Sequence, residues 1–110
     1  RCTFVERHAP TLAVARGNAR SLDLEGRCSF VKADALSFLR RGPAGVDLAL
    51  ADPPYDLEGL ASLPALVRPV LDEGGLFVLE HDARHRFEEA PGLVLTRSYG
   101  RTVVSVFEGE

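Results

Sequence analysis

Four consecutive residues, Asp52-Pro53-Pro54-Tyr55, directly follow an apolar run from Val46 to Ala51. Prolines lack an amide donor and fix φ, so a double proline ends regular structure and holds the next carbonyl rigid. The Asp52 carboxylate and the Pro53 carbonyl can accept hydrogen bonds from the exocyclic amine of a flat base, which localises the lone pair of its nitrogen. The Tyr55 ring can stack on the same base. The stretch therefore predicts a site that positions an amine as a nucleophile.

Acids also stand at the ends of other expected strands. Glu6 ends the segment Thr3–Glu6, Asp34 follows Cys28–Val31, and Glu80-His81 ends Leu76–Glu80. Ligands of open α/β sheets bind at the carboxyl ends of the strands, so these acids and Asp52 are the candidate site residues. An acid such as Glu6 can accept both hydroxyls of a ribose, although no glycine-rich turn precedes it. Any single acid can instead cap the next helix, and for Asp34 an N-cap role is an equal alternative.

Helical periodicity places three helices between these strands. Pro10 can open the first, and Gly42-Pro43 closes a short second helix over Ala35–Arg41. In the third, Pro64 can open the helix, Pro69 should shorten its last turn, and Gly74-Gly75 should close it. The apolar positions of the first and third helices are Leu12, Ala15, Ala19 and Leu22, and Leu60, Leu63, Val67, Val70 and Leu71.

The order of strands and helices predicts the fold class. The run Val46–Ala51 is continuously apolar apart from Asp47, as expected for a strand covered on both faces. Leu93–Arg97 and Thr102–Phe107 are β-rich and flank Tyr99-Gly100, which predicts a hairpin in which Tyr99 packs. We therefore predict an α/β fold, with a doubly wound, mostly parallel sheet and a C-terminal antiparallel hairpin, in a single domain over residues 1–110. Arg84–Pro91 is the expected flexible connection.

The composition suits one soluble globular domain of 110 residues with a formal net charge of -3. No apolar stretch approaches the length of a membrane helix, which predicts a cytoplasmic protein. No Cys/His cluster has metal-ligand spacing, so we expect no metal site, and Cys2 and Cys28 should be buried free thiols. The isolated histidines His8, His81 and His85 should be solvated. The chain has no methionine and begins inside an expected strand, so we expect an N-terminal segment to be missing.

The D-P-P-Y stretch resembles motif IV of the class I, S-adenosylmethionine-dependent methyltransferases that modify exocyclic amino groups. The rest of the chain resembles the RsmD-type enzymes, which methylate guanine N2 in small-subunit ribosomal RNA. The match covers nearly the whole chain, and the order and spacing of its motifs make it specific. The matching segments are Thr3-Phe4-Val5-Glu6, Asn18, Leu22, Ala33-Asp34-Ala35-Leu36, Gly74-Gly75, Glu80-His81 and Tyr99-Gly100-Arg101-Thr102.

This resemblance implies a Rossmann-like fold with S-adenosyl-L-methionine as cofactor. Glu6 would bind the cofactor ribose, and Asp34 with Ala35 would contact the adenine. Asp52 would contact the cofactor as well as the target amine, and Asp52, Pro53, Pro54 and Tyr55 would form the catalytic segment. Glu80 and His81 would line the far side of the pocket. The acceptor would be ribosomal RNA or the assembling small subunit, with no membrane partner.

The chain departs from the family pattern in two places. Leu71-Asp72-Glu73 stands where the family usually has Lys-Pro before the glycines. The family's first strand and its glycine-rich loop would precede Arg1, so the sheet should have a gap between the strands near Thr3 and Val46. Two further readings stay open. One is a DNA adenine-N6 or protein-amide methyltransferase, the latter usually with Asn at the position of Asp52; the other is a non-catalytic binding domain.

Overall fold

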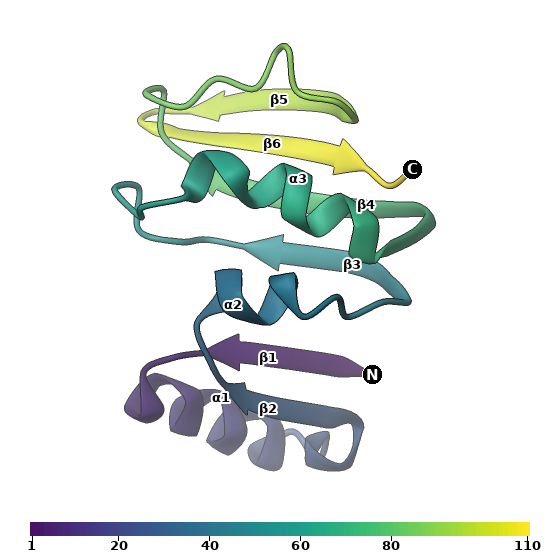
Figure 1. Cartoon of the computed structure of the whole chain (residues 1–110). Coiled ribbons are helices and arrows are strands. Elements are labelled where there is room, and N and C mark those ends of the chain that lie inside the picture. The colour runs from purple at the N-terminus through teal and green to yellow at the C-terminus, as the bar shows by residue number, and fades with distance from the viewer. The chain divides into compact units, whose positions relative to one another are not determined.

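The computed structural model describes residues 1–110, which divide into two compact units, Arg1–Arg41 and Gly42–Glu110. Each unit contains its own sheet (Figure 1). The strands therefore do not form the single sheet that the sequence predicts. Strand β1 pairs only with β2 and strand β3 only with β4, so pairing is interrupted between the strands where a gap was expected. The single domain over residues 1–110 stays a prediction.

The first unit is a parallel two-stranded sheet with its crossover helix. The elements are β1 (Cys2–Glu6), α1 (Ala9–Ser21), a 3-10 turn (Glu25–Arg27), β2 (Cys28–Lys32) and α2 (Ala35–Arg40). Pro10 lies in the first turn of α1, as predicted. Leu12 and Ala19 are buried, but Leu22 is 68% exposed because the helix ends at Ser21. The expected apolar stripe is therefore wrong at its last position.

Aromatic packing joins the two strands of this unit. Phe4 and Phe30 are register partners, and their rings stack with centroids 5.4 Å apart. The Arg16 guanidinium lies 4.9 Å from the Phe30 centroid, a cation–π contact. Cys2 and Cys28 are also register partners and are free, but Cys2 is exposed and Cys28 half-buried. The prediction of buried thiols is therefore wrong.

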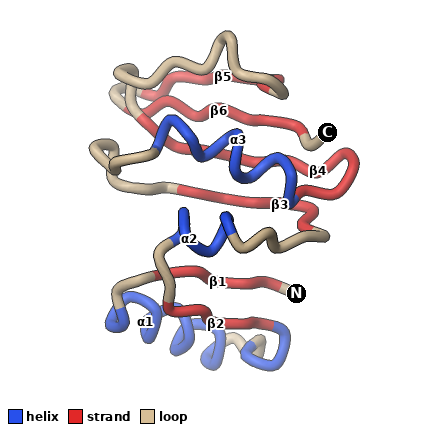
Figure 2. The backbone as a smooth tube through the Cα atoms, in the orientation of Figure 1, coloured by secondary structure: helices blue, strands red, loops and turns tan.

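The second unit is a four-stranded mixed sheet in the order β3-β4-β6-β5 (Figure 2). Its strands are β3 (Val46–Ala51), β4 (Leu71–His81), β5 (Leu93–Tyr99) and β6 (Thr102–Glu108), and between β3 and β4 lie a 3-10 turn (Leu60–Ser62), α3 (Leu63–Val67) and a second 3-10 turn (Arg68–Val70). β3 and β4 are parallel, and β6 runs antiparallel to both β4 and β5. The predicted C-terminal antiparallel hairpin is confirmed. None of the helices is long and apolar enough to span a bilayer.

The segment before β4 differs from its prediction. Pro64 lies in the first turn of α3, and the helix gives way to a 3-10 turn at Arg68, as expected from Pro69. Gly74-Gly75 does not close a helix, however, because β4 already begins at Leu71. The two glycines lie in a bulge: Val46 pairs with Leu71, whereas Leu48 pairs with Leu76. Gly74 has a φ of +78°, which glycine adopts without strain.

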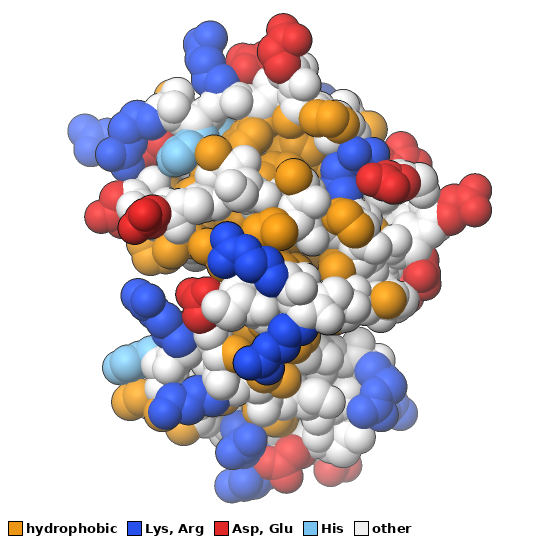
Figure 3. Space-filling model, in the orientation of Figure 1, with side chains coloured by type: hydrophobic (Ala, Val, Ile, Leu, Met, Phe, Trp, Pro, Cys, Tyr) orange, Lys and Arg blue, Asp and Glu red, His pale blue; other side chains and the backbone are white.

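The two faces of this sheet differ in burial. One face carries the buried core under α3 and the loop after β4, which includes Phe77, Leu79, His81, Phe87, Val103, Ser105 and Phe107. On the opposite face Leu48 and Leu50 of β3 are 56% and 72% exposed, so coverage of both faces of this strand is not observed. Figure 3 shows hydrophobic side chains gathered over α3 and both signs of charge at the surface.

Candidate active site

The D-P-P-Y loop leaves the end of β3 and is fixed at Tyr55. Asp52 is exposed and Tyr55 is half-buried. The Tyr55 hydroxyl lies 2.9 Å from Thr102 Oγ1 at the start of β6. The Tyr55 carbonyl accepts a hydrogen bond from His85 Nε2 at 3.4 Å, and Leu57 N donates to the Pro54 carbonyl at 2.9 Å. The loop is therefore held by its own turn and by two elements that come later in the chain.

His81 anchors the loop that follows β4. It is 1% exposed, and its Nδ1 lies 2.8 Å from the Asp82 carbonyl oxygen. Because a carbonyl only accepts, Nδ1 carries a proton, and Nε2 lies 2.7 Å from Ser105 Oγ. The prediction that His81 is solvated is wrong, since burial on the core face gives both of its nitrogens partners.

Phe87 connects the two histidines of this loop. Its ring meets His81 edge-on at a centroid distance of 4.9 Å and stacks on His85 at 6.4 Å. His85 is half-buried rather than solvated, and it faces the Tyr55 carbonyl. The segment predicted as a flexible connection thus carries a buried aromatic side chain at its centre.

Asp52 and Glu80 line one open cleft of about 480 Å³. Ala51 and Leu79 are register partners in parallel strands, so the acids that follow them lie side by side at the strand ends. The other lining residues are Leu50, Ala51, Val78 and Val104. The negative charge of Asp52 raises the pKa of Glu80, and hydrogen bonding between the two carboxyl groups and partial burial add to the rise. The cleft combines an apolar floor with two carboxyl groups at one end.

The candidate acids of the first unit lie at the corresponding ends of β1 and β2. Glu6 Oε2 accepts a hydrogen bond from His8 N at 3.1 Å. Asp34 Oδ2 accepts from Ser37 N at 3.0 Å and from Ser37 Oγ at 3.1 Å, so the N-cap role of Asp34 is confirmed. These hydrogen bonds lower the pKa of Asp34, the backbone one most strongly. Ala35, the first residue of α2, is exposed beside this cap.

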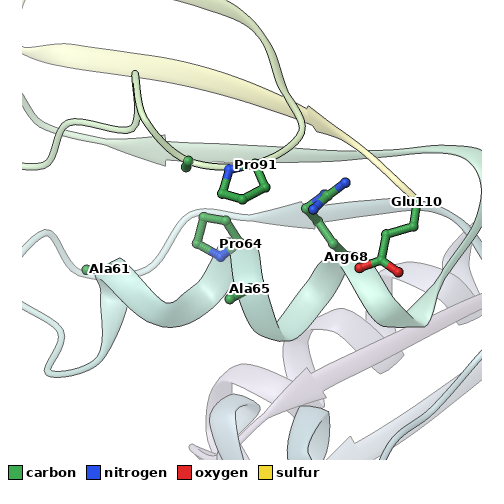
Figure 4. Close-up of a pocket in the computed structure, with 7 residues that line it drawn as sticks. Ala61, Pro64, Ala65, Arg68, Pro91 and Glu110 are labelled. Atoms are coloured by element: carbon green, nitrogen blue, oxygen red, sulfur yellow. The ribbon is translucent and has the colours of Figure 1, made fainter.

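A second groove of the Gly42–Glu110 unit lies between α3 and the loop before β5, with a volume of about 310 Å³ (Figure 4). Pro64 faces Pro91 across it in Figure 4, and Ala61, Ala65 and Ala90 complete its apolar walls. Arg68 lies at one end and is held by its Nε, which donates to the Glu108 carbonyl at 2.9 Å. None of the predicted site residues lines this groove. No group of three His, Cys, Asp or Glu side chains in the chain could hold a metal ion.

Sequence reasoning missed the groups that hold Tyr55. Thr102 was selected only as part of the Y-G-R-T segment, and His85 was expected to be solvated. The period-2 pattern of β6 places Thr102 with Val104 on the less buried face, but it does not reveal a partner from another loop. Tyr99 is 65% exposed, so its predicted packing role is wrong. It stands beside the tight turn, where no other element covers it.

A conserved hypothetical protein from Streptococcus pyogenes superposes with a TM-score of 0.81 at 25% identity, over 98% of this chain and 71% of its own. A candidate methyltransferase, yhhF from Escherichia coli, gives 0.78 at 20% identity, over 98% of this chain and 62% of its own. The candidate methyltransferase SMU.776, complexed with SAH, gives 0.71 at 14% identity, over 96% and 38%.

The present chain thus spans less than two thirds of the E. coli protein, with which it shares the fold. None of the curated proteins matches its sequence. A family model, by contrast, matches residues 1–108, almost the whole chain. The chain belongs to the family described as Conserved hypothetical protein 95.

Proposed function

We propose that this chain is the catalytic part of a cytoplasmic S-adenosylmethionine-dependent methyltransferase. Its substrate would be the exocyclic N2 amine of a guanine in small-subunit ribosomal RNA. The observation that carries the proposal is the fixed D-P-P-Y loop, in which Asp52 lies beside Glu80 at one cleft and Tyr55 is held at its hydroxyl and its carbonyl. The shared fold with candidate methyltransferases, one of them complexed with SAH, supports the reaction class. The RsmD-type resemblance supports the substrate.

The residues that the resemblance assigns to the ribose and the adenine belong to the Arg1–Arg41 unit. When bound, S-adenosylmethionine supplies the methyl group on its sulfonium. Glu6 would hold the ribose hydroxyls. Ser37 engages Asp34 only at Oδ2, which leaves Oδ1 to accept from the exocyclic amine of the adenine. Ala35 is exposed and has only a methyl side chain, so a flat ring can approach its backbone. These residues fit the cofactor in the doubly wound arrangement that the resemblance implies.

The substrate side would come from the D-P-P-Y loop. Asp52 and the Pro53 carbonyl would each accept a hydrogen bond from one N–H group of the amine, which orients the nitrogen lone pair toward the methyl group. The Tyr55 ring would set the plane of the base, while Pro54 keeps the loop rigid. Because Tyr55 is held at its hydroxyl and its carbonyl, its ring would be in place before the substrate binds, and such positioning is a main source of acceleration. An amine within a base stack is inaccessible, so the guanine must be flipped or single-stranded.

One experiment tests the reaction and its substrate together. The chain is incubated with methyl-labelled S-adenosylmethionine and one of three acceptors: unmodified small-subunit RNA, assembled small subunits or DNA. We expect label in one of the two ribosomal acceptors, on guanine N2. Label in DNA alone would favour an adenine-N6 enzyme. No label in any acceptor, together with no binding of S-adenosylmethionine in calorimetric titration, would favour the non-catalytic reading.

A further inference from the structure

The tip of the β5–β6 hairpin is a tight turn of two residues. Tyr99 and Thr102 are register partners, and Gly100 and Arg101 join them. Gly100 has a φ of +64°, which the first position of such a turn requires and which glycine adopts without strain. The turn therefore fixes the directions of the side chains on either side of it.

This turn adjoins the D-P-P-Y loop. Directly opposite residues of an antiparallel pair place their side chains on the same face, about 5 Å apart at Cβ. Thr102 contacts the Tyr55 hydroxyl, so Tyr99 extends from the face that carries this contact. Arg97 pairs with Val104, which lines the cleft of Asp52 and Glu80, so Arg97 belongs to the same face. One face of the hairpin thus continues from the candidate site to the turn.

The hairpin tip carries one exposed aromatic side chain and two exposed arginines. Tyr99 is 65% exposed, the largest exposed fraction among the aromatic side chains identified as exposed. Arg97 and Arg101 are exposed and form no ion pair, whereas Arg84 and Arg86 in the preceding loop are paired with acids. Arg101 also makes no hydrogen bond, and the only one from the Arg97 side chain goes to the neighbouring Thr96 carbonyl at 3.0 Å. One exposed aromatic ring and two guanidinium groups without an acidic partner therefore lie near the D-P-P-Y loop.

We propose that the hairpin tip binds the nucleotide next to the target base in a single-stranded nucleic acid, with Tyr99 stacking on the flanking base and Arg101 contacting its phosphate. Stacking on an aromatic ring combined with a cation at the backbone is how proteins bind single strands without reading their sequence. Arg suits the phosphate because its planar guanidinium binds two oxygens at once. The inference rests on the proposed function, since it names how the substrate of that site is held.

Fluorescence anisotropy with a labelled decamer tests the proposal. The probe is an oligouridylate with one central guanine, and the matching DNA oligonucleotide forms a second arm. Tyr99→Ala should weaken binding about 5- to 150-fold, the range for loss of one stacked base. Tyr99→Phe keeps the ring and should bind within about twofold of the unchanged chain. Arg101→Ala should weaken binding and reduce the slope of log Kd against log salt by about 0.7.

Two control variants remove comparable groups elsewhere in the same unit. Val94→Ala shortens another exposed apolar side chain of β5, and Arg86→Ala removes one charge from the preceding loop. Both should bind the probe like the unchanged chain. Circular dichroism should show the same thermal midpoint for Tyr99→Ala and Tyr99→Phe, because the ring is mostly exposed.

Calorimetric titration of S-adenosylmethionine into the same variants separates this inference from the proposed function. Weaker probe binding by Tyr99→Ala supports nucleotide binding at the hairpin tip, even if the chain binds no S-adenosylmethionine. Unchanged probe binding by both Tyr99→Ala and Arg101→Ala overturns the inference, whatever the calorimetry shows. Absence of binding to both the RNA and the DNA probe also overturns it. A loss confined to one arm supports the inference and identifies the nucleic acid.

Discussion

The hydroxyl oxygens of Tyr55 and Thr102 lie 2.9 Å apart, although 47 positions separate the two residues in the sequence. The contact joins the loop after β3 to the first residue of β6, so it fixes the Tyr55 ring relative to the sheet. In the proposed reaction this ring sets the plane of the base. The contact with Thr102 would therefore hold the Tyr55 ring in the orientation that the proposed reaction needs.

Thr102→Val removes this hydrogen bond and keeps the side-chain shape. The loss should lower the free energy of unfolding by about 0.5–1.5 kcal/mol, the net value of a typical hydrogen bond. The methylation rate should fall with little change in cofactor affinity, because the ring is held less firmly. Urea unfolding and single-turnover kinetics measure the two effects. Thr96→Val on β5 is the matched control. In the double variant, Tyr55→Phe should lower the free energy of unfolding little beyond the effect of Thr102→Val. If the losses of the two single variants instead add fully, Thr102 acts independently of Tyr55.

Asp52→Ala should abolish methylation and leave S-adenosylmethionine binding largely intact. The carboxylate is assigned to the substrate amine, and the residues assigned to ribose and adenine belong to the other unit. Initial rates with ribosomal acceptor and calorimetric titration of the cofactor measure the two properties. An equal loss of rate and of cofactor affinity would contradict the role given to Asp52.

Asp52→Asn should lower the pKa of Glu80, because the charge of Asp52 is the main cause of its rise. When folding raises the pKa of a carboxyl group, the folded state becomes less stable as pH rises from the unfolded pKa of that group to its folded pKa. Glu80→Gln should therefore raise the urea midpoint at neutral pH, and the gain should vanish below about pH 4. NMR titration of the Glu80 carboxyl carbon and urea unfolding at several pH values measure these shifts. Glu73→Gln is the control, and a Glu80 pKa unchanged by Asp52→Asn would disprove the coupling.

The sequence predicted the local elements better than the contacts between them. Helix starts near Pro10 and Pro64 follow from fixed φ angles, and the strand ends at Glu6 and Ala51 follow from apolar runs that stop abruptly. The interruption of pairing between the strands near Thr3 and Val46 was expected from the family resemblance alone, because periodicity does not encode which strands pair. The role of Gly74-Gly75 was missed for a related reason, since a glycine pair suits a helix end and a strand bulge equally well.

The same distinction holds for the candidate site. Asp52 and Glu80 could be placed together because neighbouring parallel strands end at one edge. Thr102 and His85 could not, because their contacts with Tyr55 join segments that are distant in sequence and have no shared pattern. For Asp34 both readings of the sequence were available, and the structure shows the cap.

The two roles of Asp34 can be separated by substitution. Asp34→Asn keeps an N-cap acceptor and should retain most of the stability, whereas Asp34→Ala should unfold at lower urea. If Oδ1 also accepts from the adenine amine, Asp34→Asn should bind S-adenosylmethionine more weakly despite its intact cap. The lowered pKa means that the stabilisation is present above the unfolded pKa and is lost as pH falls through the folded value. Normal cofactor affinity in a stable Asp34→Asn variant would restrict this residue to capping.

Ser105→Ala tests the buried contact that anchors the loop carrying His85. Ser105 and His81 are each 1% exposed, and their side chains are 2.7 Å apart. The substitution leaves His81 Nε2 without a partner in the core, which should lower the free energy of unfolding by about 1–3 kcal/mol. Ser98→Ala on exposed β5 is the matched control and should change stability by less than about 0.5 kcal/mol. Urea unfolding measures both variants. The rings of His81 and His85 both contact Phe87, so a shift of His81 should also displace His85. Methylation by the folded Ser105→Ala variant should therefore slow. An unchanged rate would show that the His81–Ser105 contact does not affect the position of Tyr55.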